Sequence, residues 1–487
     1  MDRGKRGDRG GMTQQMGACP CNKAQVQWVN RLIEVDLARR GVVAGLSAGV
    51  LAMLLPGLGK AQTAPAPTAT AKPVVLTNFR LFDGKSSRLR DGLSLTVDGN
   101  RIGSLTQGRP ATGDGTTVID CHGMVLMPGL IDMHWHSLLA ALPVQTILQS
   151  DMAFVYLAAA AEAERTLLRG FTTVRDAGGP AFALQQAIDS GLISGPRIYP
   201  SGAMITTTGG HGDFRPFTDL PRTGGSVSQI EKDGAAAIAD TEEEIRLRVR
   251  EQFIRGASQV KIVGSGGVSS PRSPLDMLTF TERQMRAGVE TANDWGSYAM
   301  VHAYTPAAIQ RSLAAGVQCI EHGHLMDDAT ASQMAKRNVW LSTQPFLSQD
   351  DVAPLSGVGL IRFQEIIAGT DNAIKLAKKH GIKTAFGTDL IFSATVATRQ
   401  GAMLANMGRW YSNAEVLSMV TSGNAALLAL SGKRNPYPAG LGTIAPGAYA
   451  DLLLVDGNPL DDLTLLADPG AHLKLVMKDG KVFKNQV

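Results

Sequence analysis

The feature that most constrains the fold of this chain is an alternation of short apolar runs with helical segments, which begins at Val125 and continues to about residue 432. Such alternation is typical of repeated βα units built around a parallel sheet. The runs with the length and composition of strands span 125–133, 171–178, 197–205, 259–267, 298–304, 319–324, 339–344 and 383–390. These eight units predict an α/β fold with a (β/α)8 TIM barrel over 125–432, whose chemistry lies at the C-terminal ends of the strands.

Two flanking segments, 73–124 and 433–487, lack this alternation. Both contain short alternating stretches separated by Asp-Gly pairs, in "VDGN" and "KDGK", and such pairs are strong hairpin signals. We expect these two segments to be the first and second halves of one small β-sandwich domain, built from both ends of the chain.

Residues 1–61 are interpreted as an N-terminal extension and signal peptide. Arg39-Arg40 precede the apolar run "GVVAGLSAGVLAMLLPGLG", which ends near Ala61 in the small-residue pattern of a cleavage site. The paired arginines indicate twin-arginine export, with the general secretory route as the alternative. A proline and several glycines make the run weak as a membrane span. We therefore expect no stable membrane anchor after processing, a linker at 62–72, and an exported, periplasmic or secreted protein.

The composition is that of an ordinary globular protein, with 44% apolar and 18% charged residues. A net charge of only +4, without a basic stripe, argues against nucleic acid as a partner. The cysteines (Cys19, Cys21, Cys121 and Cys319) are scattered and predict neither a disulfide framework nor a zinc knuckle. Assembly into a homo-oligomer is left open by these features.

Polar side chains gather where the predicted strands end. The stretch "PGLIDMHWH" ends in His134 and His136, and residues i and i+2 of a strand share a face, so the two imidazoles can share a metal ion. For one such pair taken alone, two packed or solvated histidines are the ordinary interpretation. The other polar residues at strand ends are Lys261, His302, His322 and Asp389. Together the six residues indicate a metal centre.

Lys261 stands between Val260 and Ile262 in "QVKIVGSGG". Burial lowers the pKa of a lysine and favours the neutral amine, which can capture carbon dioxide as a carbamate able to bridge two cations. The alternative is a lysine that reaches solvent at the strand end. From the residue type alone, a lysine that reaches solvent is at least as well supported as a carbamate. The surrounding histidines favour the carbamate.

The order HxH, Lys, His, His, Asp on a barrel resembles that of the binuclear amidohydrolase superfamily. The stretches "VKIVGSGGV", "VHAYT", "IEHG" and "FGTDL" resemble its metal-dependent dipeptidases and N-acyl-amino-acid hydrolases, a subgroup that includes Xaa-Pro and Xaa-Arg dipeptidases and ochratoxinase. The resemblance spans residues from about 75 to 485. It implies two Zn2+ or similar divalent metals, one held by His134, His136 and Asp389, the other by His302 and His322, and both bridged by carboxylated Lys261.

The resemblance further implies a metal-dependent hydrolase of a small-molecule amide substrate. Metal-activated hydroxide would attack the amide of a dipeptide or N-acyl amino acid, ochratoxin-type amides included, and the C-terminal amino acid would leave. Asp389 would shuttle the proton. His211 would bind the substrate carbonyl and Tyr304 a carboxylate, with a solvated histidine and a buried aromatic ring as the alternatives.

Other activities fit the same fold less well. A deaminase of this superfamily usually has a glutamate shortly after the histidine of the fifth strand, and "VHAYTPAA" contains none. A non-catalytic relative would have lost metal ligands, whereas this sequence has the full set. Hydrolysis of another amide, a lactone or a cyclic amide remains the main alternative.

Overall fold

The computed structural model describes residues 73–108, 113, 115–221, 227–270 and 272–487. All of them belong to one of the two units into which the chain divides, Thr70–Val487. The predicted extension and signal peptide (1–61) and the predicted linker (62–72) lie outside the described residues. What is described is an α/β fold with mixed sheets.

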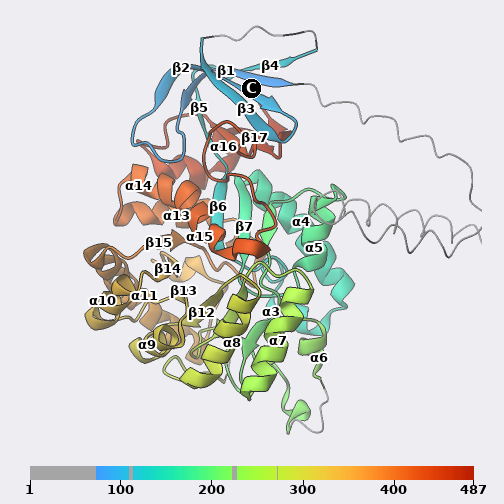
Figure 1. Ribbon diagram of the computed structural model, residues 1–487, viewed down its shortest axis with the longest axis vertical. Coiled ribbons are helices and arrows are strands. Elements are labelled where there is room, and N and C mark those ends of the chain that lie inside the picture. The colour runs from blue at the N-terminus through green and yellow to red at the C-terminus, as the bar shows by residue number, and fades with distance from the viewer. Residues whose placement is uncertain (1–72, 109–112, 114, 222–226, 271) are drawn as a thin grey trace, which may run out of the picture. The chain divides into compact units, whose positions relative to one another are not determined.

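Strands from the two ends of the chain form one eight-stranded mixed sheet, in the order β18-β17-β16-β5-β1-β2-β3 with β4 beside β1. Figure 1 shows its blue N-terminal and red C-terminal strands together at the top. The strands are β1 Val74–Leu81, β2 Arg90–Asp98, β3 Arg101–Gln107, β4 Thr117–Asp120, β5 Val125–Pro128, β16 Leu452–Val455, β17 Leu473–Lys478 and β18 Lys481–Asn485. The halves meet where β5 pairs antiparallel with β16.

The sequence predicts a hairpin at "KDGK", and the structure confirms it. Lys478 pairs with Lys481, which leaves a two-residue turn of Asp479 and Gly480. Both turn residues have positive φ, +57° and +72°, as a type I′ turn requires.

The predicted first strand, 125–133, is divided in the structure. Its first part is β5, in the sheet of the chain ends, and its second part is β6, Leu130–Trp135, which pairs in parallel with β7. The division falls at Gly129, where an added Cβ would collide with the side chain of Thr172. The sequence shows one continuous apolar run because both parts are fully buried.

The parallel strands lie in two sheets, ordered β6-β7-β8 and β10-β9-β11-β12-β13-β14-β15. The predicted strand 197–205 is also divided, into β8 and β9, at a segment with Pro200 and the positive-φ Gly202. The sequence did not predict the short β10. The remaining bounds are β7 Phe171–Asp176, β8 Arg197–Tyr199, β9 Met204–Thr206, β10 Ala236–Ile238, β11 Val260–Val263, β12 Ala299–Ala303, β13 Cys319–His322, β14 Trp340–Thr343 and β15 Thr384–Phe386.

The first and last parallel strands, β6 and β15, are joined through a side chain. The amide nitrogen of Asn424 donates to the carbonyls of Ile131 and Phe386, at 2.7 and 2.9 Å. Its amide oxygen accepts from the backbone N–H of Phe386 at 3.1 Å. Asn424 is fully buried, so these bonds satisfy a side chain that would otherwise be costly to bury.

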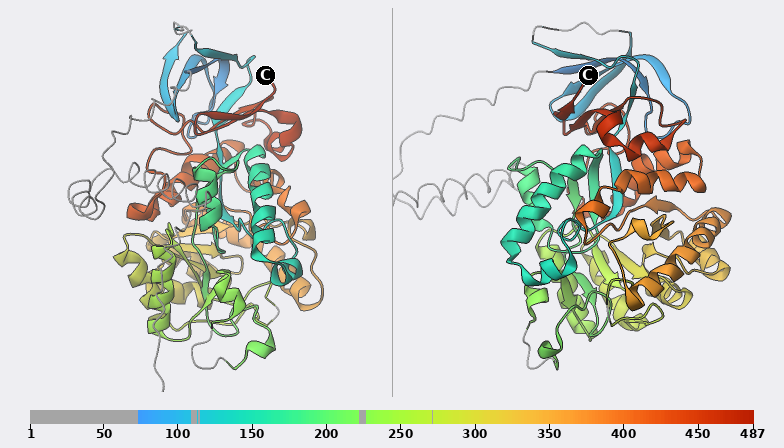
Figure 2. Two further views of the ribbon diagram at one scale, coloured as in Figure 1. Left: turned by 90° about the vertical axis from the view of Figure 1, so that its right-hand side faces the viewer. Right: turned by 180° about the vertical axis from the view of Figure 1, so that it is seen from behind.

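The longer helices connect successive parallel strands and lie around their outside in Figures 1 and 2. They are α4 Met152–Leu168, α5 Phe182–Asp189, α7 Glu242–Ile254, α8 Glu282–Asp294, α9 Pro306–Ala315, α10 Asp328–Lys336 and α11 Gly357–His380. The shorter ones are α3 Val144–Gln149, α6 Gln229–Lys232, α12 Ala394–Ala397, α13 Gln400–Asn406, α14 Asn413–Ser418, α15 Asn424–Leu428 and α16 Pro469–His472. Helix α9 illustrates the local signals, with Pro306 at its first position and Gly316 as a left-handed C-cap.

One helical run among the described residues, Asn413–Arg434, is long and apolar enough to cross a membrane by length and composition. Half of its most apolar window is buried inside the protein. A core helix has the same composition, so this run is weak evidence for a membrane span.

The sheet of the chain ends is attached to β8 by a buried ion pair. The guanidinium of Arg197 donates to both carboxylate oxygens of Asp451, at 3.0 and 3.2 Å, and to Asp479 at 2.7 Å. It also lies 3.8 Å over the ring of Tyr449. Asp451 precedes β16, so the pair joins segments 254 residues apart in the chain.

Asp451→Ala should lower the free energy of unfolding by about 3 kcal/mol, because it leaves the buried Arg197 with only the more exposed Asp479. Urea or thermal unfolding measures this. The control is Glu290→Ala, which removes the exposed ion pair with Arg246 and should cost at most about 1 kcal/mol. Equal effects of the two variants would contradict a stabilising role of the buried pair.

Candidate metal centre and active site

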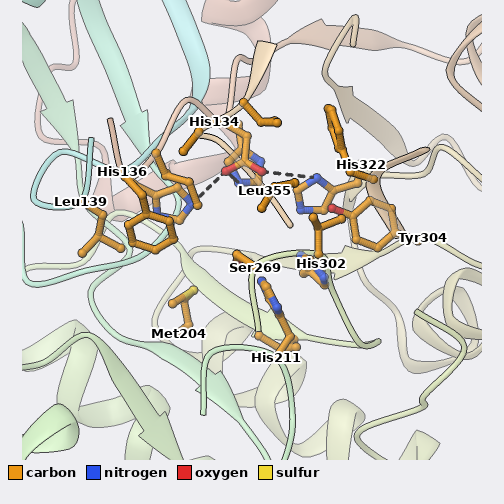
Figure 3. Close-up of a pocket in the computed structure, with 18 of the residues that line it drawn as sticks. His134, His136, Leu139, Met204, His211, Ser269, His302, Tyr304, His322 and Leu355 are labelled. Atoms are coloured by element: carbon orange, nitrogen blue, oxygen red, sulfur yellow. Dashed lines mark ion pairs between the residues drawn. The ribbon is translucent and has the colours of Figure 1, made fainter. Parts of the chain in front are cut away.

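All six predicted metal ligands line one cavity, together with His211 and Tyr304. Figure 3 shows the labelled histidines and Tyr304 around this pocket. The ligands come from the ends of β6, β11, β12 and β13 and from the segment after β15. The common edge of the parallel strands therefore brings together residues that are up to 255 positions apart, from His134 to Asp389.

His134 is held by a chain of buried charges. Its Nδ1 lies 2.7 Å from Oε2 of Glu321, and Oε1 of Glu321 accepts from Arg175 at 2.6 Å. All three side chains are buried. A carboxylate only accepts, so Nδ1 of His134 carries the proton and Nε2 faces the cavity. Burial favours a protonated Glu321, but Arg175 and His134 outweigh it and hold the pKa of Glu321 well below its usual range.

The other histidines are oriented in the same way. Nδ1 of His136 donates to the carbonyl of Gly178 at 2.8 Å, and Nε2 of His302 donates to the carbonyl of Gly266 at 3.0 Å. Nδ1 of His322 lies 2.9 Å from the side-chain oxygen of Gln344. In each case one ring nitrogen meets a protein acceptor and the other is left for the cavity, as in metal-ligating histidines.

Asp389 lies in the middle of this group. Its Oδ1 is 3.3 Å from Nε2 of His136 and 3.5 Å from Nε2 of His134, and its Oδ2 is 3.9 Å from Nδ1 of His322. Burial opposes its ionisation, but the two nearest histidines and Lys261 outweigh burial and lower the pKa of Asp389 to about 2. The carboxylate is therefore ionised near neutral pH.

The backbone of Asp389 is strained, with φ of +54°, and His322 has φ of +74°. Such values are costly for residues other than glycine and persist only where surrounding contacts enforce them. The N–H of Asp389 donates to the carbonyl of His134 at 2.8 Å. Asp132 accepts from the backbone N–H groups of His134 and Thr388, at 3.0 and 3.1 Å. It holds the strands that carry the ligands rather than an imidazole ring.

Lys261 is 2% exposed, which agrees with the expected burial and not with a lysine that reaches solvent. Its Nζ lies 3.3 Å from Nε2 of His134. Burial lowers the pKa of Lys261 to about 8, so a neutral amine is accessible close to physiological pH.

His211 and Tyr304 lie on the His302 side of the cavity. The ring of His211 stacks on that of His302 with centroids 4.3 Å apart, and the ring of Tyr304 meets it edge-on at 5.0 Å. His211 is partly buried against His302, and burial lowers its pKa to about 3. Its Nδ1 is buried and has no hydrogen-bond partner among the described residues.

These residues fit a metal site. Oxygen and nitrogen donor atoms of His134, His322 and Asp389 lie within 4.8 Å of one another. Nε2 of His322 is buried and unpaired among the described atoms, although an orphaned ring nitrogen is costly. Burial lowers the pKa of His134 to about 4 and that of His322 well below its ordinary value, so both rings are neutral, as metal ligation requires.

Two residues that orient the proposed ligands, Glu321 and Arg175, were not predicted from the sequence. They lie within predicted strands, yet they meet across 146 residues of sequence. Arg175 also donates to the hydroxyl of Tyr298 at 2.9 Å. A usable signal was present, because a charged residue inside an apolar strand must find a partner of opposite charge in the core.

Histidine, aspartate and lysine side chains that gather at the ends of parallel strands in an α/β fold could hold a divalent metal. Residues 125–483 match the amidohydrolase family, and the chain belongs to this family.

The chain resembles known enzymes in sequence and in structure. The chain is 28% identical over 375 residues to ochratoxinase of Aspergillus niger, covering 74% of this chain and 76% of that protein. The crystal structure of an amidohydrolase matches with a TM-score of 0.77 and 34% identity, covering 85% of this chain and 100% of that one. That of a prolidase complexed with N-methylphosphonate-L-proline matches with a TM-score of 0.77, 32% identity and the same coverage. The chain is thus an amide-bond hydrolase, acting on C–N bonds.

Glu321→Gln should weaken the affinity for a divalent metal about 10–100-fold, because the amide cannot serve both His134 and Arg175 as an anionic acceptor. Competition with a chelator measures the affinity, and circular dichroism verifies the fold. Glu365→Gln on the exposed face of α11 is the matched control and should bind metal like the wild type. Unchanged affinity in Glu321→Gln would show that the link to His134 does not support the site.

Proposed function

We propose that this chain is a zinc-dependent hydrolase with a binuclear centre, which cleaves the amide bond of dipeptides or N-acyl amino acids and releases the C-terminal amino acid. The observation that carries the proposal is the convergence of four imidazoles, the Asp389 carboxylate and the Lys261 amine on one cavity. The likeness to ochratoxinase and to a prolidase supports an amino acid as the leaving group.

We also propose that the parallel strands form a closed (β/α)8 barrel and that the sheet of the chain ends is a β-sandwich. The bridge that Asn424 makes between β6 and β15 supports closure. Along β16, Leu452 and Leu454 pack into one apolar cluster while Leu453 and Val455 pack into another, which supports two buried faces.

In this proposal His134, His136 and Asp389 would hold one zinc ion, and His302 and His322 would hold the other. A carbamate formed on Lys261 would be a ligand shared by the two sites. Imidazole and carboxylate ligands suit zinc. When bound there, zinc would polarise a carbonyl and make a water molecule more acidic.

Asp389 acts as the proton shuttle of the proposed reaction. Its ionised carboxylate accepts a proton from the water that attacks the carbonyl and then donates it to the amide nitrogen. That second transfer matters because an amide nitrogen is a poor leaving group. The low pKa of Asp389 keeps it in the accepting form before the reaction.

His211 and Tyr304 bind the substrate beside these groups. The unpaired, buried Nδ1 of His211 is available for the substrate carbonyl. Tyr304 lines the cavity next to His322, with ring centroids 4.7 Å apart. In this proposal its hydroxyl donates a hydrogen bond to the carboxylate of the leaving amino acid.

Asp389→Asn should lower kcat about 10²–10⁴-fold while substrate binding changes little, because the amide cannot carry the proton. Asparagine tolerates the left-handed backbone of this position, so the fold is retained. Steady-state kinetics on a panel of dipeptides and N-acyl amino acids measures the effect. Asp371→Asn, on the outside of α11, is the matched control with wild-type kcat.

Free-acid and C-terminally amidated substrates separate two parts of the proposal. Amidated substrates should be poor, because they lack the carboxylate that Tyr304 recognises. Equal cleavage of both forms would overturn carboxylate recognition. Cleavage of a lactone or cyclic amide alone would overturn the substrate class.

Lys261→Ala should lose bound zinc and activity together, and short carboxylic acids should partly restore both. Lys261→Arg should not be restored, since a guanidinium stays cationic and forms no carbamate. Elemental analysis should find two zinc ions per wild-type chain. Full zinc content in Lys261→Arg would exclude the carbamate bridge.

A further inference from the structure

The cavity contains almost no charge outside the proposed metal site. Among the described residues that line it, only Asp389 and Lys261 have side chains that are charged near neutral pH, and both are proposed ligands. Asp213 and Asp351 adjoin the lining residues Phe214 and Val352 in sequence but do not line the cavity themselves. Asp213 is paired with Arg215 at 2.7 Å, and Asp351 with Arg399 at 2.7 Å.

The lining of the cavity differs between its two sides. Polar groups lie around His302, namely His211, Tyr304 and Ser269. In Figure 3 Leu139 lies beside His136, on the opposite side from Tyr304. Ile391 and Phe392 also line the cavity, and Phe392 bonds to Leu139, so we call Leu139, Ile391 and Phe392 its apolar wall.

Phe392 is held in this wall at an energetic cost. Its φ is +62°, a left-handed conformation that is unusual for an aromatic residue. Its N–H donates to the carbonyl of Leu139 at 2.8 Å, and the next N–H, of Ser393, donates to the carbonyl of Ala140 at 3.1 Å. Strain enforced by such bonds at a cavity is typical of residues that contact a ligand.

The placement of the substrate follows from these two sides. If the leaving carboxylate is bound by Tyr304 and the scissile carbonyl lies at Asp389, the acyl half of the substrate extends toward the apolar wall. A dipeptide would bring its α-ammonium there. No acid lines the cavity at that end among the described residues, and an ammonium that loses water without an anionic partner is strongly disfavoured.

We infer that the substrate is an N-acyl amino acid whose acyl group is uncharged, bulky and apolar, and that Phe392 is a specificity-determining residue for this group. A dipeptide with a free amino terminus is a poor substrate. The inference rests on the proposed function and selects between the two substrate classes that it contains.

The test uses two substrates that differ only in the α-amino group: 3-phenylpropanoyl-L-alanine and L-phenylalanyl-L-alanine. The same pair is repeated with other C-terminal amino acids. We expect kcat/KM to be about 100-fold higher for the acylated member, since an apolar pocket discriminates by about this factor against an analogue that adds one polar group. Equal or faster cleavage of the free dipeptide overturns the inference and leaves the proposed function standing. If neither series is cleaved, the proposed function itself fails.

Two substitutions at Phe392 provide a matched comparison, because asparagine and aspartate both tolerate its left-handed backbone. Phe392→Asn should lower kcat/KM for 3-phenylpropanoyl-L-alanine about tenfold, through the lost aromatic contact. Phe392→Asp differs from it by a carboxylate and should raise the ratio of dipeptide to acyl cleavage above that of Phe392→Asn. Zinc content is measured in both, to show that the metal site is unchanged. Identical ratios in the two variants would overturn the role of Phe392.

Discussion

The carboxylate of Glu321, buried between Arg175 and His134, is the interaction on which the rest of the site depends. A buried charge without its partner is so costly that strands β6, β7 and β13 must keep the register that brings these three residues together. The same contact sets the tautomer of His134 and turns its Nε2 toward Asp389 and Lys261. The stability of the fold and the geometry of the ligands therefore rest on the same ion pair.

A second group of buried bonds holds the strained segment after β15. Asp132 accepts from both the backbone and the hydroxyl of Thr388, and it also accepts from Gln400 of α13 at 3.0 Å. Gln400 in turn accepts from Arg169 at 2.9 Å. This polar chain ties the position of Asp389 to helices outside the parallel strands, so strain at the proposed proton shuttle is supported by contacts far from the substrate.

The charged and the apolar residues of the cavity lie in different parts of it. The charged lining residues, Asp389 and Lys261, are both proposed metal ligands, while the wall formed by Leu139, Ile391 and Phe392 is apolar. An apolar pocket strengthens the electrostatic interactions within it, because little water is present to screen the charges. Burial also lowers the pKa values of His134 and His211 and keeps their rings neutral.

The sequence by itself determined that strands and helices alternate and which residue types stand at the strand ends, because strand periodicity and the His-x-His spacing are local properties. It could not reveal the division of 125–133, since a run buried on both sides looks the same whether or not Gly129 breaks it. It also could not show that Arg175 meets Glu321, that Asp132 binds Thr388, or that Asn424 joins β6 to β15. Each of these contacts joins residues more than 30 positions apart, and only the register of the assembled strands decides which buried donor reaches which acceptor.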